Sequence, residues 1–157
     1  MSQIDPKFFK PFIEGTLNTM KVQCGLVATG RPPFLLGHGP EIDIALAGVI
    51  RISGERFTGQ VSLCFPEKVF LGLMERMLGE PFPEITPELR DGAAEILNII
   101  YGQAKVALNQ SGPPVEMAIP AVIHGDALKS RSAGGGKVFV LPFASEVGEF
   151  RIEIFGN

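Results

Sequence analysis

The sequence has only two cysteines, no excess of positive charge and no long hydrophobic run. Cys24 and Cys64 form no CxxC pair, so we expect a cytoplasmic protein whose thiols stay reduced. A net charge of −3 argues against nucleic-acid binding through bulk charge, because neutralising phosphates takes clustered Lys and Arg. The longest apolar run that contains a Gly, residues 44–50, is too short to span a bilayer, and residues 1–12 lack the apolar core of a signal peptide. We therefore expect neither a membrane nor nucleic acid as a partner.

The sequence does contain enough apolar material for a packed core. Apolar residues make up 45% of the chain, which excludes a disordered protein. The length of 157 residues fits one domain, residues 1–157. Nineteen glycines and thirteen prolines are dispersed through the chain and indicate many turns.

Local signals predict three helices and several short strands. The first helix begins at Pro6 or Pro11 and ends at Cys24, the second begins at Pro66 and stops at Gly79, and the long third helix runs from Thr86-Pro87 to about Gln110. Alternating apolar residues predict strands at residues 44–53, 59–65, 115–125, 137–143 and 149–155. Residues 129–137 are predicted to form a flexible hairpin loop between two of these strands.

Two parts of the sequence are similar to each other, which suggests a duplicated unit. At an offset of 89, residues 49–52 match residues 138–141, and residues 59–63 match residues 148–152. One explanation is that all short hairpins look alike; the other is a repeated unit of a helix and antiparallel strands. We predict an α+β fold, a mostly antiparallel sheet with long helices packed on it, built from two pseudo-symmetric halves.

The long helix has two faces when each residue advances by about 100°. Its core side is predicted to hold Leu89, Ala93, Ile96, Ile100, Ala104 and Ala107, with Leu97 and Leu108 at the edge. The opposite side gathers Asp91, Glu95, Asn98, Gly102 and Lys105. Glu95 and Asn98 lie one turn apart and point away from the core.

Asn98 and Gly102 are poor choices for an exposed helix face. Mid-helix Asn costs more than about 0.5 kcal/mol relative to Ala, and Gly about 1 kcal/mol. Drift would explain both residues, since natural proteins carry many non-optimal side chains. A docking face would explain them too, because Gly102 would let a partner backbone come close. Asp91 could help in docking, or could be a solvated carboxylate near the helix start.

The Glu95 and Asn98 side chains suit positioning better than nucleophilic attack. No His or Cys stands beside them in the sequence to activate a nucleophile. A carboxamide can hold a water by donating and accepting hydrogen bonds, and a carboxylate can bind a cation such as a lysine. His38 and His124 lie far apart and predict no metal site, and residues 132–138 lack the spacing of a phosphate-binding loop.

At these residues the sequence resembles the CheC/CheX chemotaxis phosphatases, and single-site CheX proteins most closely. The family signature is Glu-x-x-Asn on a long helix, which stands here in "DGAAEILNIIYGQAK", residues 91–105. The resemblance continues in "GVIRISGERFTGQVSLCFPEKVFLGLMERMLGE", "VEMAIPAVIHG" and "VFVLPF", so it covers most of the chain. The bare motif is weak, but the ordered set of segments is fairly specific.

The resemblance implies hydrolysis of the aspartyl phosphate on a CheY-like response regulator. Asn98 would enter the regulator's active site and orient the attacking water, while Glu95 would pair with the regulator's lysine. Asp91, Gly102 and Lys105 would belong to the docking face. The Mg²⁺ would come with the regulator, so no cofactor or metal of the protein's own is expected. By analogy alone, we also expect a homodimer.

One departure from the family pattern concerns the first helix. Two-site relatives carry a second Glu-x-x-Asn there, whereas here Glu14 and Asn18 stand four apart. The broken spacing favours a single-site, CheX-like protein. Two rival functions remain open: a non-catalytic module that binds a receiver domain with the same helix face, and an interaction domain unrelated to phosphorylation.

Overall fold

The computed structural model describes residues 6–55, 57–117, 119–130 and 136–156. Its helices are α1 (Phe9–Cys24), α2 (Glu67–Leu78) and α3 (Pro87–Gln110), with short 3₁₀ helices η1 (Pro6–Phe8) and η2 (Gly125–Ser130). Its strands are β1 (Ala28–Gly30), β2 (Phe34–Leu35), β3 (Leu46–Gly54), β4 (Gly59–Phe65), β5 (Val115–Met117), β6 (Ala121–His124), β7 (Val138–Ser145) and β8 (Phe150–Gly156). The strands form one antiparallel sheet in the order β1-β7-β8-β4-β3-β5, in which β2 also pairs with β7 and β6 with β3. The predicted α+β fold is confirmed.

Local chemistry sets the ends of the helices. The Thr86 side chain accepts a hydrogen bond of 3.2 Å from the Leu89 amide, and Pro87 occupies the first turn of α3. α2 and α1 end at Gly79 and Gly25, whose φ angles of 81° and 60° favour glycine. The predicted start of α3 and the predicted ends of α1 and α2 are thus confirmed, whereas α1 begins at Phe9, after the 3₁₀ turn η1, rather than at Pro6 or Pro11.

The pairing of strands shows that the molecule is built from two related halves. The hairpins β3–β4 and β7–β8 meet through β4 and β8, where Val61 pairs with Ile154. In the first half, α1 is followed by the short strands β1 and β2, which pair with β7 of the second half. In the second half, α3 is followed by the short strands β5 and β6, which pair with β3 of the first half.

The strand register shifts at the same place in both halves, between β1 and β2 and between β5 and β6. Gly30 pairs with Phe143 and Phe34 with Val140, so three residues stand opposite two. Met117 pairs with Ile52 and Ala121 with Val49, so the register between the two strands shifts by one residue here as well. In both halves the short strands carry one more residue than the strand they pair with, as in a β-bulge. This shared feature favours duplication over the explanation that all short hairpins look alike.

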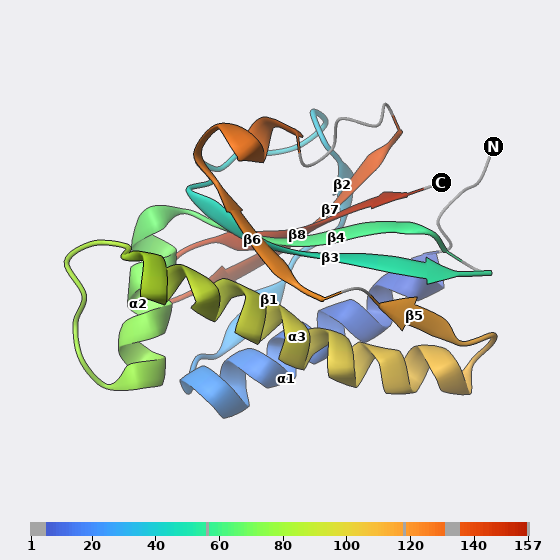
Figure 1. The fold of residues 1–157 in the computed structure, drawn as a ribbon, viewed down its shortest axis with the longest axis horizontal. Helices are drawn as coiled ribbons and strands as arrows, with labels where there is room; N and C mark the ends of the chain where they lie inside the picture. Colours follow the sequence, from blue (N-terminus) through green and yellow to red (C-terminus); the bar gives the residue numbers. More distant parts are fainter. Residues whose placement is uncertain (1–5, 56, 118, 131–135, 157) are drawn as a thin grey trace.

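The sheet has a different cover on each face. α1 and α3 lie on one face and enclose the main core, whereas η2 lies on the other (Figure 1). On that second face a small cluster forms around Ala47, Val49, Cys64 and Leu128. α3 approaches the sheet closely, because a Cβ added at Gly48 would lie 2.6 Å from the Ala93 carbonyl oxygen.

Two expectations from the sequence are wrong. Residues 129–137 do not join a hairpin, because β6 pairs with β3 while β7 pairs with β8, β1 and β2; residues 131–135 lie outside the described chain. Ala107 is exposed rather than in the core, because after Ala104 only Leu108 is buried in α3. Tyr101 fills the core beside Phe12 instead.

Among the described residues, no helix is long and apolar enough to cross a membrane.

Candidate functional site

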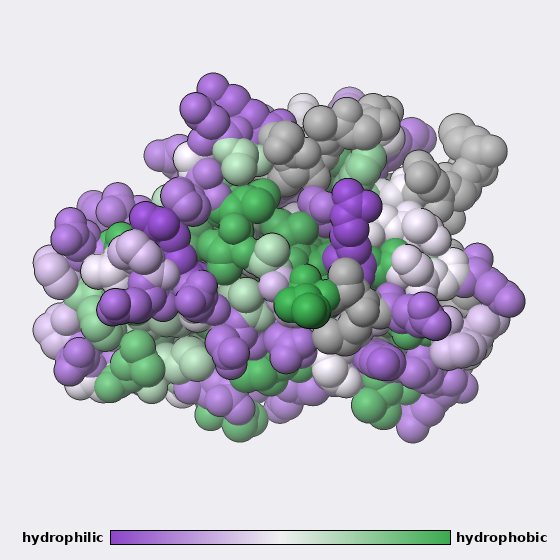
Figure 2. Space-filling model, viewed as in Figure 1, coloured by the Kyte–Doolittle hydropathy of each residue, from purple (hydrophilic) through white to green (hydrophobic). Residues whose placement is uncertain are grey.

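The outer face of α3 presents the residues that the sequence singled out. Asp91, Glu95, Asn98 and Gly102 are exposed, and Lys105 is half-buried at the edge of the face. The opposite side of the helix holds the buried residues Leu89, Ala93, Ile96, Leu97, Ile100, Tyr101, Ala104 and Leu108. Polar side chains predominate along α3 in the space-filling view (Figure 2). The helix therefore carries a polar, solvent-facing ridge on a firmly packed base.

Close backbone packing holds α3 in place beneath this ridge. α1 crosses it so tightly that a Cβ added at Gly15 would lie 3.1 Å from the Ile100 carbonyl oxygen. A Cβ added at Gly102, by contrast, would meet no atom within 4 Å. Intramolecular packing therefore explains the glycine at position 15 but not the one at position 102.

The side chains of Glu95 and Asn98 have no hydrogen bond or ion pair with any other residue of the described chain. The similar polar pair on α1, Glu14 and Asn18, does have partners within the molecule. Glu14 forms an exposed ion pair of 3.7 Å with Lys10, and the Asn18 amide donates a 2.9 Å hydrogen bond to Gln103 Oε1 on α3. Gln103 in turn donates to the Thr19 hydroxyl at 2.9 Å, so Asn18 is part of the contact between the helices. Only the α3 pair is left free for a partner within this part of the chain.

The free pair can position groups that a partner brings. Side chains three residues apart on a helix have Cβ atoms about 5–6 Å apart, so a single ligand can touch both. The Asn98 carboxamide can donate to one group and accept from another, and the Glu95 carboxylate can accept from a cation. The two cysteines are poor nucleophiles. Both are buried, and burial raises the pKa of the Cys24 thiol to about 11.

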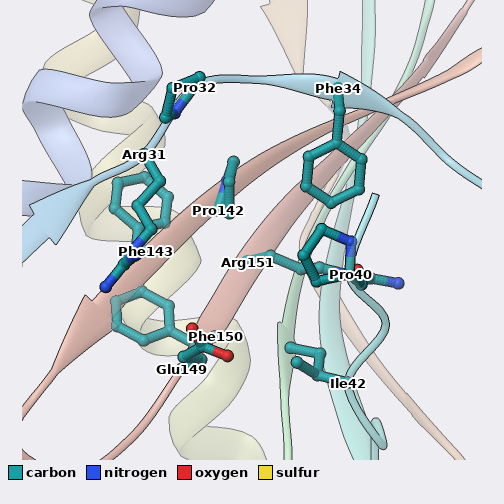
Figure 3. A pocket seen from close by; sticks show the side chains of 10 residues that line it. All are labelled: Arg31, Pro32, Phe34, Pro40, Ile42, Pro142, Phe143, Glu149, Phe150 and Arg151. Atoms are coloured by element: carbon teal, nitrogen blue, oxygen red, sulfur yellow. The ribbon is translucent and has the colours of Figure 1, made fainter. Parts of the chain in front are cut away.

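A second candidate site is a hollow of about 220 Å³ between β7, β8 and the segment that carries β2. Figure 3 shows Phe34 and Phe143 on either side of it, with Pro142 between them. The buried charge at its wall is already paired: the Arg151 guanidinium donates to Glu153 at 2.8 Å and to the Pro40 carbonyl at 3.4 Å. The Arg151 charge of this hollow already has partners, whereas the Glu95 and Asn98 side chains have none in the described chain, so the exposed face of α3 is the better candidate.

The structure also shows two things about this region that the sequence did not reveal. Gln103 ties Asn18 to α3, which depends on how the two helices cross. Val106, one turn beyond Gly102, is exposed although it is apolar. The helical period could have revealed it, because the period places Val106 about 20° from Glu95 on the outer face.

Residues 46–144 match the protein family described as chemotaxis phosphatase CheX. The chain belongs to this family. The match includes α3 and with it the Glu-x-x-Asn residues of the predicted site. No curated protein matched the chain when their sequences were compared.

Several solved structures are similar to this chain over almost its whole length. CheX from Vibrio vulnificus has 31% identity and a TM-score of 0.83, with 96% of this chain and 99% of that chain covered. A CheC-like superfamily protein from Shewanella sp. PV-4 has 28% identity and a TM-score of 0.82, with 98% and 99% covered. CheX in a complex with CheY, BeF₃ and Mg²⁺ from Borrelia burgdorferi is 17% identical, with 99% of both chains covered and a TM-score of 0.79, and shares the fold.

Proposed function

We propose that this protein hydrolyses the aspartyl phosphate of a CheY-like response regulator. The observation that carries the proposal is the free Glu95 and Asn98 pair on the exposed ridge of α3, while the similar pair on α1 has internal partners. Membership of the chemotaxis phosphatase CheX family supports the activity, and the complex of a Borrelia burgdorferi relative with CheY supports the choice of partner.

In this proposal α3 docks against the receiver domain and inserts Asn98 next to the phosphoaspartate. The Asn98 carboxamide holds a water in line with the phosphorus. The water oxygen forms a bond to phosphorus as the bond between phosphorus and the aspartyl oxygen breaks. The products are a free carboxylate and inorganic phosphate, and both protons of the water leave with the phosphate. The Mg²⁺ belongs to the regulator and neutralises the phosphoryl oxygens. The enzyme contributes positioning rather than a covalent intermediate.

Glu95 pairs with a lysine of the regulator and fixes the position of α3 along the active site. Asp91 adds negative charge to the same ridge, and Lys105 borders it. Gly102 leaves open space into which the partner's backbone can approach. Regulator and phosphatase would meet in the cytoplasm. The expected homodimer is a separate proposal that sedimentation would test.

The direct test is the lifetime of the phosphoryl group on a CheY-like receiver with and without this protein. The proposal predicts that catalytic amounts shorten the lifetime and release inorganic phosphate. A protein that binds the phosphorylated receiver without changing the lifetime would instead be a docking module. A protein that binds neither form of the receiver would have no tie to phosphorylation through this face.

A further inference from the structure

Val106 extends the ridge of α3 beyond the residues of the motif. It is 59% exposed, and at 100° per residue it lies about 20° to one side of Glu95, while Gly102 lies about 20° to the other. It follows Gly102 by four residues and is therefore the next side chain along the ridge, about 16 Å from Glu95 along the helix axis.

Nothing in the described part of the molecule explains a valine at this place. β-branching makes Val a weaker helix former than Ala, Leu or Gln, and an exposed side chain gains little from burial. A single exposed Val is ordinary on a protein surface. Val106, however, lies in line with Asn98 and Gly102, the other two residues of the ridge that do not favour a helix. The three together suggest that a partner selects the residues of this ridge.

The ridge changes its chemical character along its length. Its N-terminal half carries three exposed carboxylates, Glu88, Asp91 and Glu95. Its C-terminal half is uncharged along its centre and carries Gly102, Val106 and Asn109. A complementary partner would place cationic groups against the first half and an apolar surface against the second.

The size of a protein contact also requires more than the motif. A specific protein–protein contact typically buries about 1,200–2,000 Å² in total, which two polar side chains cannot supply. Gly102 offers open space but no side chain, so the next residue of the ridge that can fill a partner's apolar patch is Val106.

We propose that Val106 is a docking residue, which packs against an apolar patch on the receiver domain beside its phosphorylation site. The inference rests on the proposed function and adds to it a hydrophobic contact that strengthens binding without taking part in the chemistry. The acidic half of the ridge orients the receiver, and the Val106 contact holds it.

The test uses two substitutions at Val106 and a matched control. Val106→Gln removes the apolar contact while improving helix propensity, and Val106→Leu keeps an apolar side chain. Leu78→Gln is the control, because Leu78 is also an exposed apolar residue, 57% exposed, but belongs to α2 and not to the ridge of α3. We expect Val106→Gln to raise the KM for the phosphorylated receiver about tenfold with kcat unchanged. Val106→Leu and Leu78→Gln should stay within about twofold of the wild type.

An unchanged KM in Val106→Gln would overturn the inference, and so would an equal loss in Val106→Leu. The same proteins are also tested for binding to a receiver activated with beryllofluoride and Mg²⁺. If the wild type fails to release phosphate but Val106→Gln binds that receiver about tenfold more weakly, the docking role stands and the proposed phosphatase fails. If the wild type releases phosphate and all variants bind alike, the phosphatase stands and the docking role of Val106 fails.

Discussion

The helices α1 and α3 occupy related places in the two halves of the molecule, but their polar residues have different partners. On α1, Asn18 donates to Gln103 and Glu14 pairs with Lys10. On α3, Glu95 and Asn98 have no partner among the described residues. The comparison shows that Glu and Asn side chains contribute to internal contacts on α1, whereas on α3 the same residue types remain free to contact a partner. An unpartnered polar pair on a rigid helix is therefore the better indicator of function.

The largest expected effect separates the two asparagines. We expect Asn98→Ala to lower the rate of phosphate release by about 10²–10³-fold, the range found when one preorganised hydrogen-bonding group is removed from an active site. The variant should remain folded, because Ala is the better helix former. Asn18→Ala should leave the rate unchanged. It loses an exposed hydrogen bond to Gln103 but gains helix propensity, so the free energy of unfolding should fall by less than about 1 kcal/mol. Phosphate release assays and denaturant unfolding measure the two effects.

The two glutamates should differ by a smaller factor. Glu95→Gln removes a charge from the proposed contact with a regulator lysine, so we expect about tenfold weaker binding to the activated receiver. Glu14→Gln breaks only an exposed ion pair, which contributes less than about 1 kcal/mol, and should leave binding unchanged. Titration at low and high salt provides the control: the deficit of Glu95→Gln should shrink as salt screens the wild-type contact. Equal affinities of the two variants would count against the assigned role of Glu95.

The two glycines should respond in opposite ways to alanine. Gly102→Ala adds a methyl group to open space, so we expect a gain in unfolding free energy of about 1 kcal/mol together with weaker binding to the receiver. Gly15→Ala places its methyl group 3.1 Å from the Ile100 carbonyl oxygen, so it should be the less stable of the two variants. Thermal and denaturant unfolding compare the stabilities. If Gly102→Ala binds as tightly as the wild type, drift is the better explanation of this glycine.

The smallest expected effect lies on the inner side of α3. The Tyr101 hydroxyl is buried without a hydrogen-bond partner in the described structure, and burial raises its pKa. Tyr101→Phe should therefore raise stability by up to about 1 kcal/mol. In the wild type, the unfolded chain releases this proton at a lower pH than the folded chain, so stability falls as pH rises above about 10. Unfolding curves between pH 8 and 11 should show a weaker fall for Tyr101→Phe, and equal slopes would contradict the assignment.

The sequence predicted the parts of the fold that depend on neighbouring residues. Thr86 and Pro87 start α3 and Gly79 ends α2 through local capping, so these bounds could be read directly. The pairing of the short strands of one half with the hairpin of the other could not be predicted, because β1 pairs with β7, which lies more than a hundred residues later in the chain. The outward direction of Glu95 and Asn98 followed from the helical period. The engagement of Asn18 did not, since it depends on Gln103 of a second helix.

The most direct test of the central claim compares chemistry and binding in one variant. Phosphate release from the phosphorylated receiver and affinity for the beryllofluoride-activated receiver would be measured side by side for the wild type and Asn98→Ala. The account predicts that Asn98→Ala loses at least about 10²-fold in rate while its affinity stays within a few-fold. An Asn98→Ala protein that releases phosphate at the wild-type rate would contradict the claim that Asn98 positions the attacking water.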